Sequence, residues 1–204
     1  MTQGKSDEQY RDRADCDPQT CPCPDGRCTL SRYTRAVGAE GSGGRTLAVT
    51  ERAVADRLAG LEVDMTAMAA VQNLYRAANA VRNHVEQTVL APYQLTWTGW
   101  VVLWVVWIWD EIEPRHVAIE AGISKGTLTG VVKTLEARGL LLRHDHPDDA
   151  RRVLLRLTPA GRRLMKSLFP EFNRQETALT AGLGAGGTAE IARLLRAMVL
   201  DLER

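Results

Sequence analysis

The sequence lacks three features that are typical of other protein classes. No cysteine follows Cys28, so thiol chemistry is confined to the start of the chain. No apolar run reaches the roughly 20 residues needed to cross a bilayer, and the opening MTQGKSDEQYRDR has no apolar stretch typical of a secretory signal. The 204 residues are 45% hydrophobic and 25% charged, as in a soluble globular domain with an appendage. We therefore expect a cytoplasmic protein with no membrane partner.

The net charge of +1 conceals a basic block in the second half of the chain. Residues 114–166 contain eleven Lys and Arg against five Asp and Glu, a net of +6, whereas residues 51–113 carry a net of −4. A basic block in an otherwise neutral chain is typical of a module that binds a polyanion such as nucleic acid. The charge alone is equally compatible with an ordinary solvated surface.

Residues 1–50 show no apolar periodicity and include the linker-like EGSGG at residues 40–44, which predicts a poorly ordered extension. Their distinctive feature is a group of four cysteines within thirteen residues: Cys16, Cys21, Cys23 and Cys28. Such a group could bind a metal ion or act as a redox switch. The spacing is not the paired C-x2-C of common zinc sites, and a tail without an essential role is the alternative.

Helical periodicity begins near residue 50. Apolar residues recur at intervals of three and four from Met68 to Val89, which predicts a long amphipathic helix ending before Pro92. The following WTGWVVLWVVWIW, residues 97–109, contains all five tryptophans and predicts a second helix, because acidic residues end the apolar run at Asp110. One face of that helix carries Trp97, Trp100, Trp104 and Trp107. This stripe fits either a buried core or the wall of a ligand pocket.

Two short helical patterns follow, separated by a Gly122-Ile123-Ser124 turn, and together they predict a helix-turn-helix. After it, LLLRHD and RVLLRLT predict a β-hairpin with a polar tip at residues 146–150, which in this position is called a wing. Thr158-Pro159 predicts the start of a helix running to about Thr180. A final helix from about Thr188 has one apolar face, formed by Ile191, Leu194, Leu195, Met198 and Leu202. Because no segment remains to cover this face, it indicates a partner subunit.

The second helix of the motif has a small, polar outer face. Its apolar residues Leu128, Val131, Val132 and Leu135 form an inward stripe, while Gly126 and Gly130 lie on the opposite face. Each exposed helical glycine costs about 1 kcal/mol relative to alanine, and close approach to the major groove of DNA would explain this cost. We expect DNA contacts from Ser124, Lys125, Thr127, Thr129, Gly130 and Lys133 on the helix, and from Asp149, Arg151 and Arg152 at the wing. An arginine there could enter a narrow minor groove.

Three segments resemble the MarR family of bacterial winged helix-turn-helix transcriptional regulators: LEARGL at residues 135–140, Asp149-x-Arg151, and LTPAG at residues 157–161. The resemblance extends from about Met65 to the C-terminus. It implies a mainly α fold with a small β-wing, in which a winged helix-turn-helix joins a helical dimerisation region. After the poorly ordered extension with the cysteines (1–50), which lies outside the resemblance, the implied parts are N-terminal dimerisation helices (51–95), the winged helix-turn-helix DNA-binding domain (96–158) and C-terminal dimerisation helices (159–204).

The resemblance also implies a function. A homodimer would bind a pseudo-palindromic operator in double-stranded DNA, with Arg151 in the minor groove and Asp149 orienting it, and would act mainly as a repressor. A small, often aromatic, effector would bind beside the tryptophan helix and release the DNA; Trp97, Trp100 and Trp104 are the candidate pocket residues. The alternative is a metal- or redox-responsive DNA-binding regulator, switched by the four cysteines.

An enzyme is not expected. The four histidines, at positions 84, 116, 144 and 146, are scattered, and the sequence contains no nucleophile with its base and no phosphate-binding loop. We accordingly expect no cofactor. Thiol sensing by cysteines within the folded body, which some MarR proteins use, is excluded because the body contains none.

Overall fold

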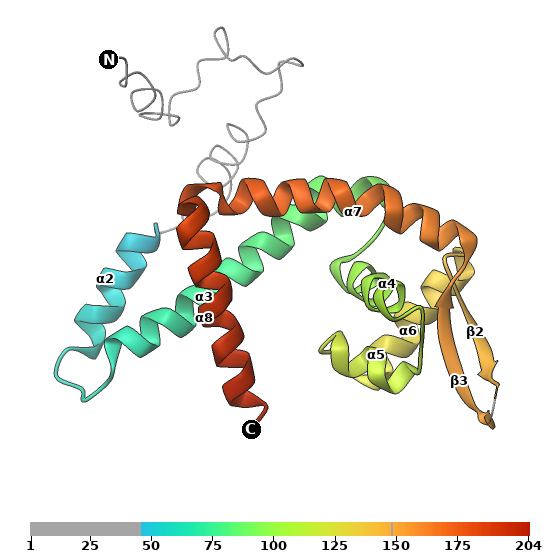
Figure 1. The fold of residues 1–204 in the computed structure, drawn as a ribbon. Coiled ribbons are helices and arrows are strands. Elements are labelled where there is room, and N and C mark those ends of the chain that lie inside the picture. The colour runs from blue at the N-terminus through green and yellow to red at the C-terminus, as the bar shows by residue number, and fades with distance from the viewer. Residues whose placement is uncertain (1–45, 148) are drawn as a thin grey trace, which may run out of the picture. The chain divides into compact units, whose positions relative to one another are not determined.

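The computed structural model describes residues 46–147 and 149–204, which divide into two compact units on either side of the Met65/Thr66 boundary (Figure 1). The first unit contains helix α2 (Leu47–Leu58). Thr46 caps this helix, since its hydroxyl accepts a hydrogen bond from the Val49 N–H at 3.3 Å. The expected boundary between residues 50 and 51 therefore lies inside a helix. The four cysteines lie outside the described residues.

The second unit is mainly helical. Its helices are α3 (Met65–Val85), the π-helix η1 (Glu86–Leu90), the 3-10 helix η2 (Ala91–Tyr93), α4 (Trp97–Trp109), α5 (Pro114–Glu120), α6 (Lys125–Ala137), α7 (Pro159–Thr180), the 3-10 helix η3 (Ala181–Leu183) and α8 (Gly184–Leu202). The regular α-helical geometry of α3 ends at Val85, earlier than the periodicity to Val89 predicts. The π and 3-10 turns precede and include Pro92, whose ring cannot continue an α-helix without losing a hydrogen bond.

Three helices begin where a hydroxyl residue caps them. Thr96, Ser124 and Thr158 each accept a hydrogen bond from the backbone N–H three residues later, at 3.0–3.1 Å. Helix α7 spans the predicted residues, but α8 begins at Gly184, four residues before the predicted start. Thr188 is not its cap, because its hydroxyl donates to the Gly184 carbonyl within the helix at 2.9 Å.

The wing belongs to a three-stranded antiparallel sheet with the order β1-β3-β2 (Figure 1). The predicted hairpin is formed by β2 (Leu141–His146) and β3 (Asp149–Leu157). Strand β1 (Glu111–Ile112) pairs with the other edge of β3, Ile112 opposite Leu155, and was not predicted, because two residues carry no readable alternation. The expected mainly α fold with a small β-wing is confirmed.

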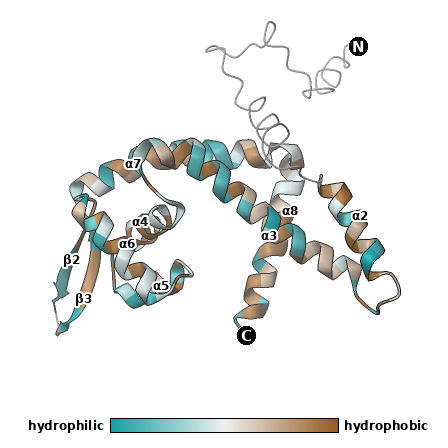
Figure 2. Ribbon diagram, turned by 180° about the vertical axis from the view of Figure 1, so that it is seen from behind, coloured by the Kyte–Doolittle hydropathy of each residue, from teal (hydrophilic) through white to brown (hydrophobic). Residues whose placement is uncertain are grey.

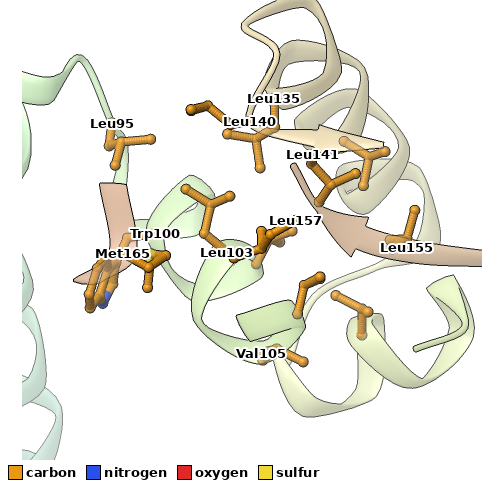
Figure 3. Packing of buried hydrophobic residues seen from close by; sticks show 14 of the residues in the cluster. Leu95, Trp100, Leu103, Val105, Leu135, Leu140, Leu141, Leu155, Leu157 and Met165 are labelled. Carbon is orange, nitrogen blue, oxygen red and sulfur yellow. The ribbon is translucent and has the colours of Figure 1, made fainter. Parts of the chain in front are cut away.

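The hydrophobic core lies among α4, α6, the sheet and the start of α7 (Figure 3). Helix α4 contributes Leu103 and Val106, and β2 and β3 contribute Leu141 and Leu155, all fully or almost fully buried. The predicted inward stripe of α6 is buried at Leu128, Val132 and Leu135 and half-buried at Val131. The tryptophan segment is therefore a core helix, although four of its five tryptophans retain some exposure. Among the described residues, no single helix is long and apolar enough to cross a membrane, and one pair meets the limits only across a 76° bend.

Helices α3 and α8 carry hydrophobic residues along their lengths (Figure 2), and in the described chain several of these side chains are exposed. On α8 the exposed residues include Ile191, Leu194 and Met198, at 42%, 47% and 40% exposure. On α3 they include Val71 and Tyr75. The apolar face predicted for the last helix is therefore exposed, and so is part of the apolar stripe predicted for α3.

Candidate nucleic-acid interface

The turn between α5 and α6 places the second helix of the helix-turn-helix. Gly122 adopts φ +62°, a left-handed conformation that other residues rarely adopt. The chain then turns back, and the Ile123 N–H donates to the Ala118 carbonyl at 3.0 Å. Ser124 caps α6 through its hydroxyl, which accepts from the Thr127 N–H at 3.1 Å. The N-terminus of α6 is therefore exposed to solvent. Its free backbone N–H groups and the helix dipole favour an anion at this end.

The predicted DNA-contacting residues of α6 share one exposed face. Lys125, Thr127, Thr129, Gly130 and Lys133 are all exposed. The Thr129 hydroxyl donates to the Lys125 carbonyl at 2.9 Å, so it is available to an external partner mainly as an acceptor. The face therefore presents two cationic and two hydroxyl side chains on a short stretch of helix.

The fold itself gives no reason for the two glycines of this face. A Cβ built on Gly130 would meet no atom within 4 Å, and one on Gly126 would meet only the Ser124 hydroxyl oxygen, at 3.8 Å. Neither glycine has a positive φ. Alanine would fit at both positions and would favour the helix. The absence of a side chain there is therefore better explained by close contact with another molecule.

The wing carries its two arginines on a β-bulge. His146 pairs with Asp149, but the next pair along the strands is Asp145 with Val153, so residues 150–152 of β3 bulge out of the ladder. We call residues 150–152 the arginine bulge. Bulges are a common means of re-aiming side chains at the edge of a site.

Asp149 fixes the backbone of this bulge. Its Oδ1 accepts a hydrogen bond from the Arg151 N–H at 3.0 Å. The family resemblance implies that Asp149 orients Arg151, and in the described residues the Asp149 carboxylate contacts Arg151 through the backbone N–H. Arg151 itself is exposed.

Arg152 contacts the start of the helix-turn-helix, although 43% of its side chain is exposed. Its guanidinium donates to Oε1 of Glu113, which lies between β1 and α5. Oε2 of Glu113 also lies 3.0 Å from Nε of Arg115. The hydrogen bond from Arg152 is the main reason why the pKa of Glu113 is lowered, and the positive charges of Arg115, Arg152 and His116 act in the same direction. The sequence analysis missed Glu113; its position directly before Pro114, where Ser, Thr, Asp or Asn usually caps a helix, was the available signal.

Glu111 of β1 binds the middle of β3. Oε1 of Glu111 lies 3.0 Å from Nη1 of Arg156 and 3.4 Å from Nε2 of His144 on β2. These contacts link all three strands on one face of the sheet. Arg156 and His144 therefore stabilise the base of the wing.

The tryptophan stripe packs against the two phenylalanines of α7. Trp100 stacks on Phe172 with ring centroids 4.4 Å apart, and Trp104 stacks on Phe169 at 4.8 Å. Trp100 and Phe172 are buried, whereas Trp97, Trp104 and Phe169 are half-buried. The sequence analysis missed both phenylalanines, although they are the only two in the chain and lie three residues apart, on one helix face.

Hydrogen bonds connect the end of α6 to the segment before α4. The Arg138 guanidinium donates to the backbone carbonyls of Tyr93 and Gln94, both at 2.7 Å. The Tyr93 hydroxyl donates to Glu171 of α7 at 3.3 Å. These hydrogen bonds join the end of α6 and helix α7 to the segment that precedes α4.

Within residues 46–147 and 149–204, no group of three or more His, Cys, Asp or Glu is arranged to bind a metal ion. The proposed cysteine site lies outside these residues.

Comparisons with known proteins agree on one family. The sequence model of the MarR family matches residues 95–153. The chain is 34% identical over 140 residues to YwaE, an uncharacterized HTH-type transcriptional regulator of Bacillus subtilis, covering 69% of this chain and 82% of YwaE.

Solved structures give the same result. A structure of Bordetella bronchiseptica BpsR, whose DNA binding is regulated by 6-hydroxynicotinic acid, is 30% identical with a TM-score of 0.58; the match covers 64% of this chain and 98% of that one. A structure of NadR in complex with 4-hydroxyphenylacetate is 26% identical with a TM-score of 0.55, covering 64% and 89%. Together with the winged helix-turn-helix and its exposed recognition face, these similarities show that the chain belongs to the MarR family of DNA-binding transcriptional regulators.

Proposed function

We propose that this regulator binds a pseudo-palindromic operator as a homodimer and represses transcription until a small aromatic acid releases it. The observation that carries the DNA-binding geometry is the exposed face of α6, with glycines that the fold does not require. In this arrangement α6 enters the major groove, where Lys125 and Lys133 contact base edges or phosphates. Arg151 enters the minor groove.

The proposed dimer rests on the uncovered faces of α3 and α8. Side chains such as Tyr75 and Ile191 expose apolar area that a second subunit would bury. A twofold dimer would present two recognition helices about one turn of DNA apart, which matches a palindromic site. Under this proposal residues 51–95 and 159–204 serve dimerisation, and residues 96–158 read DNA.

Analytical ultracentrifugation and fluorescence anisotropy with operator-bearing DNA test both parts. The dimer proposal predicts one species of twice the chain mass at micromolar concentration. Affinity should fall steeply with salt, because several phosphate contacts release counterions. Arg151→Ala should weaken binding by a factor on the order of ten while the circular dichroism spectrum stays unchanged. A monomer that binds DNA with full affinity would contradict the dimer.

The proposed effector is a small aromatic ring that bears a carboxylate and a hydroxyl group. The DNA binding of BpsR is regulated by 6-hydroxynicotinic acid, and the NadR structure is a complex with 4-hydroxyphenylacetate; both molecules have these groups. In this chain Trp97 and Trp104 offer half-buried indole faces beside α7. Trp100, which stacks on Phe172 in the core, supports the wall from behind. Aromatic faces of this kind stack on planar ligands.

Tryptophan fluorescence titrations with these two acids test the effector. Binding should quench emission, and the same concentrations should release labelled operator DNA. The Trp104→Phe variant should weaken the quenching and the release together. Trp109→Phe is the matched control, because Trp109 ends α4 at 58% exposure, away from the stacked rings. Quenching without any loss of DNA binding would show that these acids are not effectors.

A promoter fused to a reporter gene tests repression. Deletion of the regulator should raise expression of the reporter.

A further inference from the structure

Glu113 occupies a capping position without capping. It is the N-cap residue of α5, but its side chain makes no capping hydrogen bond. The N-cap residues of α4, α6 and α7 all do so through Ser or Thr hydroxyls. Glutamate is not among the preferred N-cap residues. Its presence here therefore requires another role.

The side chain of Glu113 is directed to the arginine bulge. Only 14% of the side chain is exposed, and its carboxylate contacts Arg152 of the bulge and Arg115 of α5. A carboxylate removed from most of its water needs such partners to remain ionised. The lowered pKa of Glu113 agrees with an anion that stays paired at neutral pH. The contact joins residues 39 positions apart, so it fixes tertiary structure rather than a local turn.

The register between β2 and β3 shifts at the bulge. Residues 150–152 fall between the pairs His146 with Asp149 and Asp145 with Val153. Two carboxylates contact the bulge. Asp149 accepts from the backbone N–H of Arg151, and Glu113 accepts from the guanidinium of Arg152. Arg151 is therefore held through its backbone, whereas Arg152 is held through its side chain.

We propose that Glu113 and Arg152 form a clamp that holds the arginine bulge against the start of the helix-turn-helix, so that Arg151 is presented to DNA at a fixed position relative to α6. Arg152 is then a positioning residue and not a DNA contact. The inference rests on the proposed minor-groove role of Arg151. It differs from the sequence-based expectation, in which Arg152 contacts DNA directly.

The two roles of Arg152 predict opposite effects of removing the Glu113 charge. If Arg152 contacts DNA, loss of a neighbouring anion leaves DNA affinity unchanged or raises it, because repulsion of phosphate decreases and Arg152 is released. If Glu113 and Arg152 form a clamp, the same change loosens the bulge and lowers affinity. The sign of the change therefore decides between the two.

The test uses the full-length protein and fluorescence anisotropy with operator DNA at several salt concentrations. Glu113→Ser removes the carboxylate but supplies a preferred N-cap, so α5 should keep its start. Glu113→Gln, which keeps the side-chain shape, is measured beside it. Both should weaken DNA binding about fivefold, a modest effect in keeping with the small coupling energies of partly exposed ion pairs. The melting temperature of Glu113→Ser should not fall. Unchanged or tighter DNA binding by both variants would overturn the clamp.

A double-mutant cycle with Arg152→Ala gives a second criterion. For a clamp, Glu113→Ser together with Arg152→Ala should be no worse than either change alone, because both remove one interaction. The slope of log affinity against log salt should stay that of the wild type, whereas loss of a direct phosphate contact reduces it by about 1. Additive effects with a reduced slope would overturn the proposal.

Arg151→Ala, measured in the same assay, separates this inference from the proposed function. Weaker binding by Arg151→Ala with unchanged binding by both Glu113 variants removes only the clamp. Unchanged binding by Arg151→Ala removes the proposed wing contact and the clamp with it.

Discussion

Gly161 of α7 packs directly against the backbone carbonyl of Leu140. A Cβ built on Gly161 would overlap the carbonyl oxygen and lie 3.0 Å from the carbonyl carbon. The same oxygen accepts a hydrogen bond from the Thr158 N–H at 3.1 Å, and the Thr158 hydroxyl donates to the Gly139 carbonyl at 2.6 Å. The LTPAG segment therefore ties the end of the wing to the residues that precede β2, and its glycine is required by close backbone approach.

Gly161→Ala should lower the free energy of unfolding by about 1–3 kcal/mol, the usual range for an overpacked buried site. The backbone carbonyl of Leu140 cannot rotate away as a flexible side chain could. Urea denaturation monitored by circular dichroism measures the change. The matched control is Gly182→Ala, at a position where an added Cβ meets no atom within 4 Å. Equal stability of the Gly161 variant and the wild type would contradict the packing described here.

The glycines of α6 should behave in the opposite way. Gly126→Ala and Gly130→Ala should each raise the free energy of unfolding by up to about 1 kcal/mol, because alanine favours the helix and meets no close atom. Both should weaken operator binding if the α6 backbone approaches the major groove closely. Denaturation and anisotropy measurements on the same preparations check the two effects. Variants that are more stable and bind DNA normally would remove the proposed explanation of these glycines.

Much of this architecture could be predicted from local sequence signals. The caps at Ser124 and Thr158 and the left-handed turn at Gly122 are encoded by residues that favour those conformations wherever they occur. The buried stripe of α6 follows from spacing alone. Such features depend on neighbours within four residues, and sequence patterns report them well.

The contacts of the candidate site were harder to predict, because they join distant residues. The pair Glu113 and Arg152, and the pair Trp104 and Phe169, come together only after the sheet and α7 have packed. Charge counts placed Arg152 in a basic block. They could not show that its guanidinium donates to the carboxylate of Glu113, 39 positions earlier in the chain. Strand β1 was missed for the same reason, since two residues form a strand only against β3.

Arg138 should contribute to stability through the segment that it binds. Its guanidinium donates to the carbonyls of Tyr93 and Gln94, and Gln94 is held at φ +52°, an uncommon conformation for a residue with a side chain. Arg138→Met keeps the aliphatic stem and removes both donors. The free energy of unfolding should fall by about 1 kcal/mol, because Arg138 is exposed and water replaces part of each bond.

Two variants control the Arg138 experiment. Arg138→Lys should give an intermediate stability, because lysine keeps the charge but lacks the fork that reaches two carbonyls. Arg163→Met, at an exposed arginine of α7, should change the free energy of unfolding by less than about 0.5 kcal/mol. Hydrogen exchange at residues 93–97 should quicken in Arg138→Met alone. Protection equal to the wild type there would show that the two bonds do not hold the segment.

The contribution of Glu113 to stability should disappear in acid. Its pKa lies below the ordinary value of 4.5, chiefly because Arg152 donates a hydrogen bond to the carboxylate. A carboxyl group whose pKa is lower in the folded than in the unfolded protein stabilises the fold fully above its unfolded pKa. That contribution is lost as the pH falls through the lower, folded pKa.

Glu113→Gln provides the reference, because glutamine does not titrate. The difference in the free energy of unfolding between wild type and Glu113→Gln should stay constant from about pH 7 to pH 5 and shrink below about pH 4.5. Urea denaturation across this range measures it. Glu190→Gln is the matched control, since the pKa of Glu190 is also lowered, by the Arg193 hydrogen bond within α8, but this exposed pair joins residues three apart. The difference in the free energy of unfolding between wild type and Glu190→Gln should be smaller at every pH, because an exposed local ion pair constrains little tertiary structure. A Glu113 difference that grows toward acid would contradict the paired carboxylate.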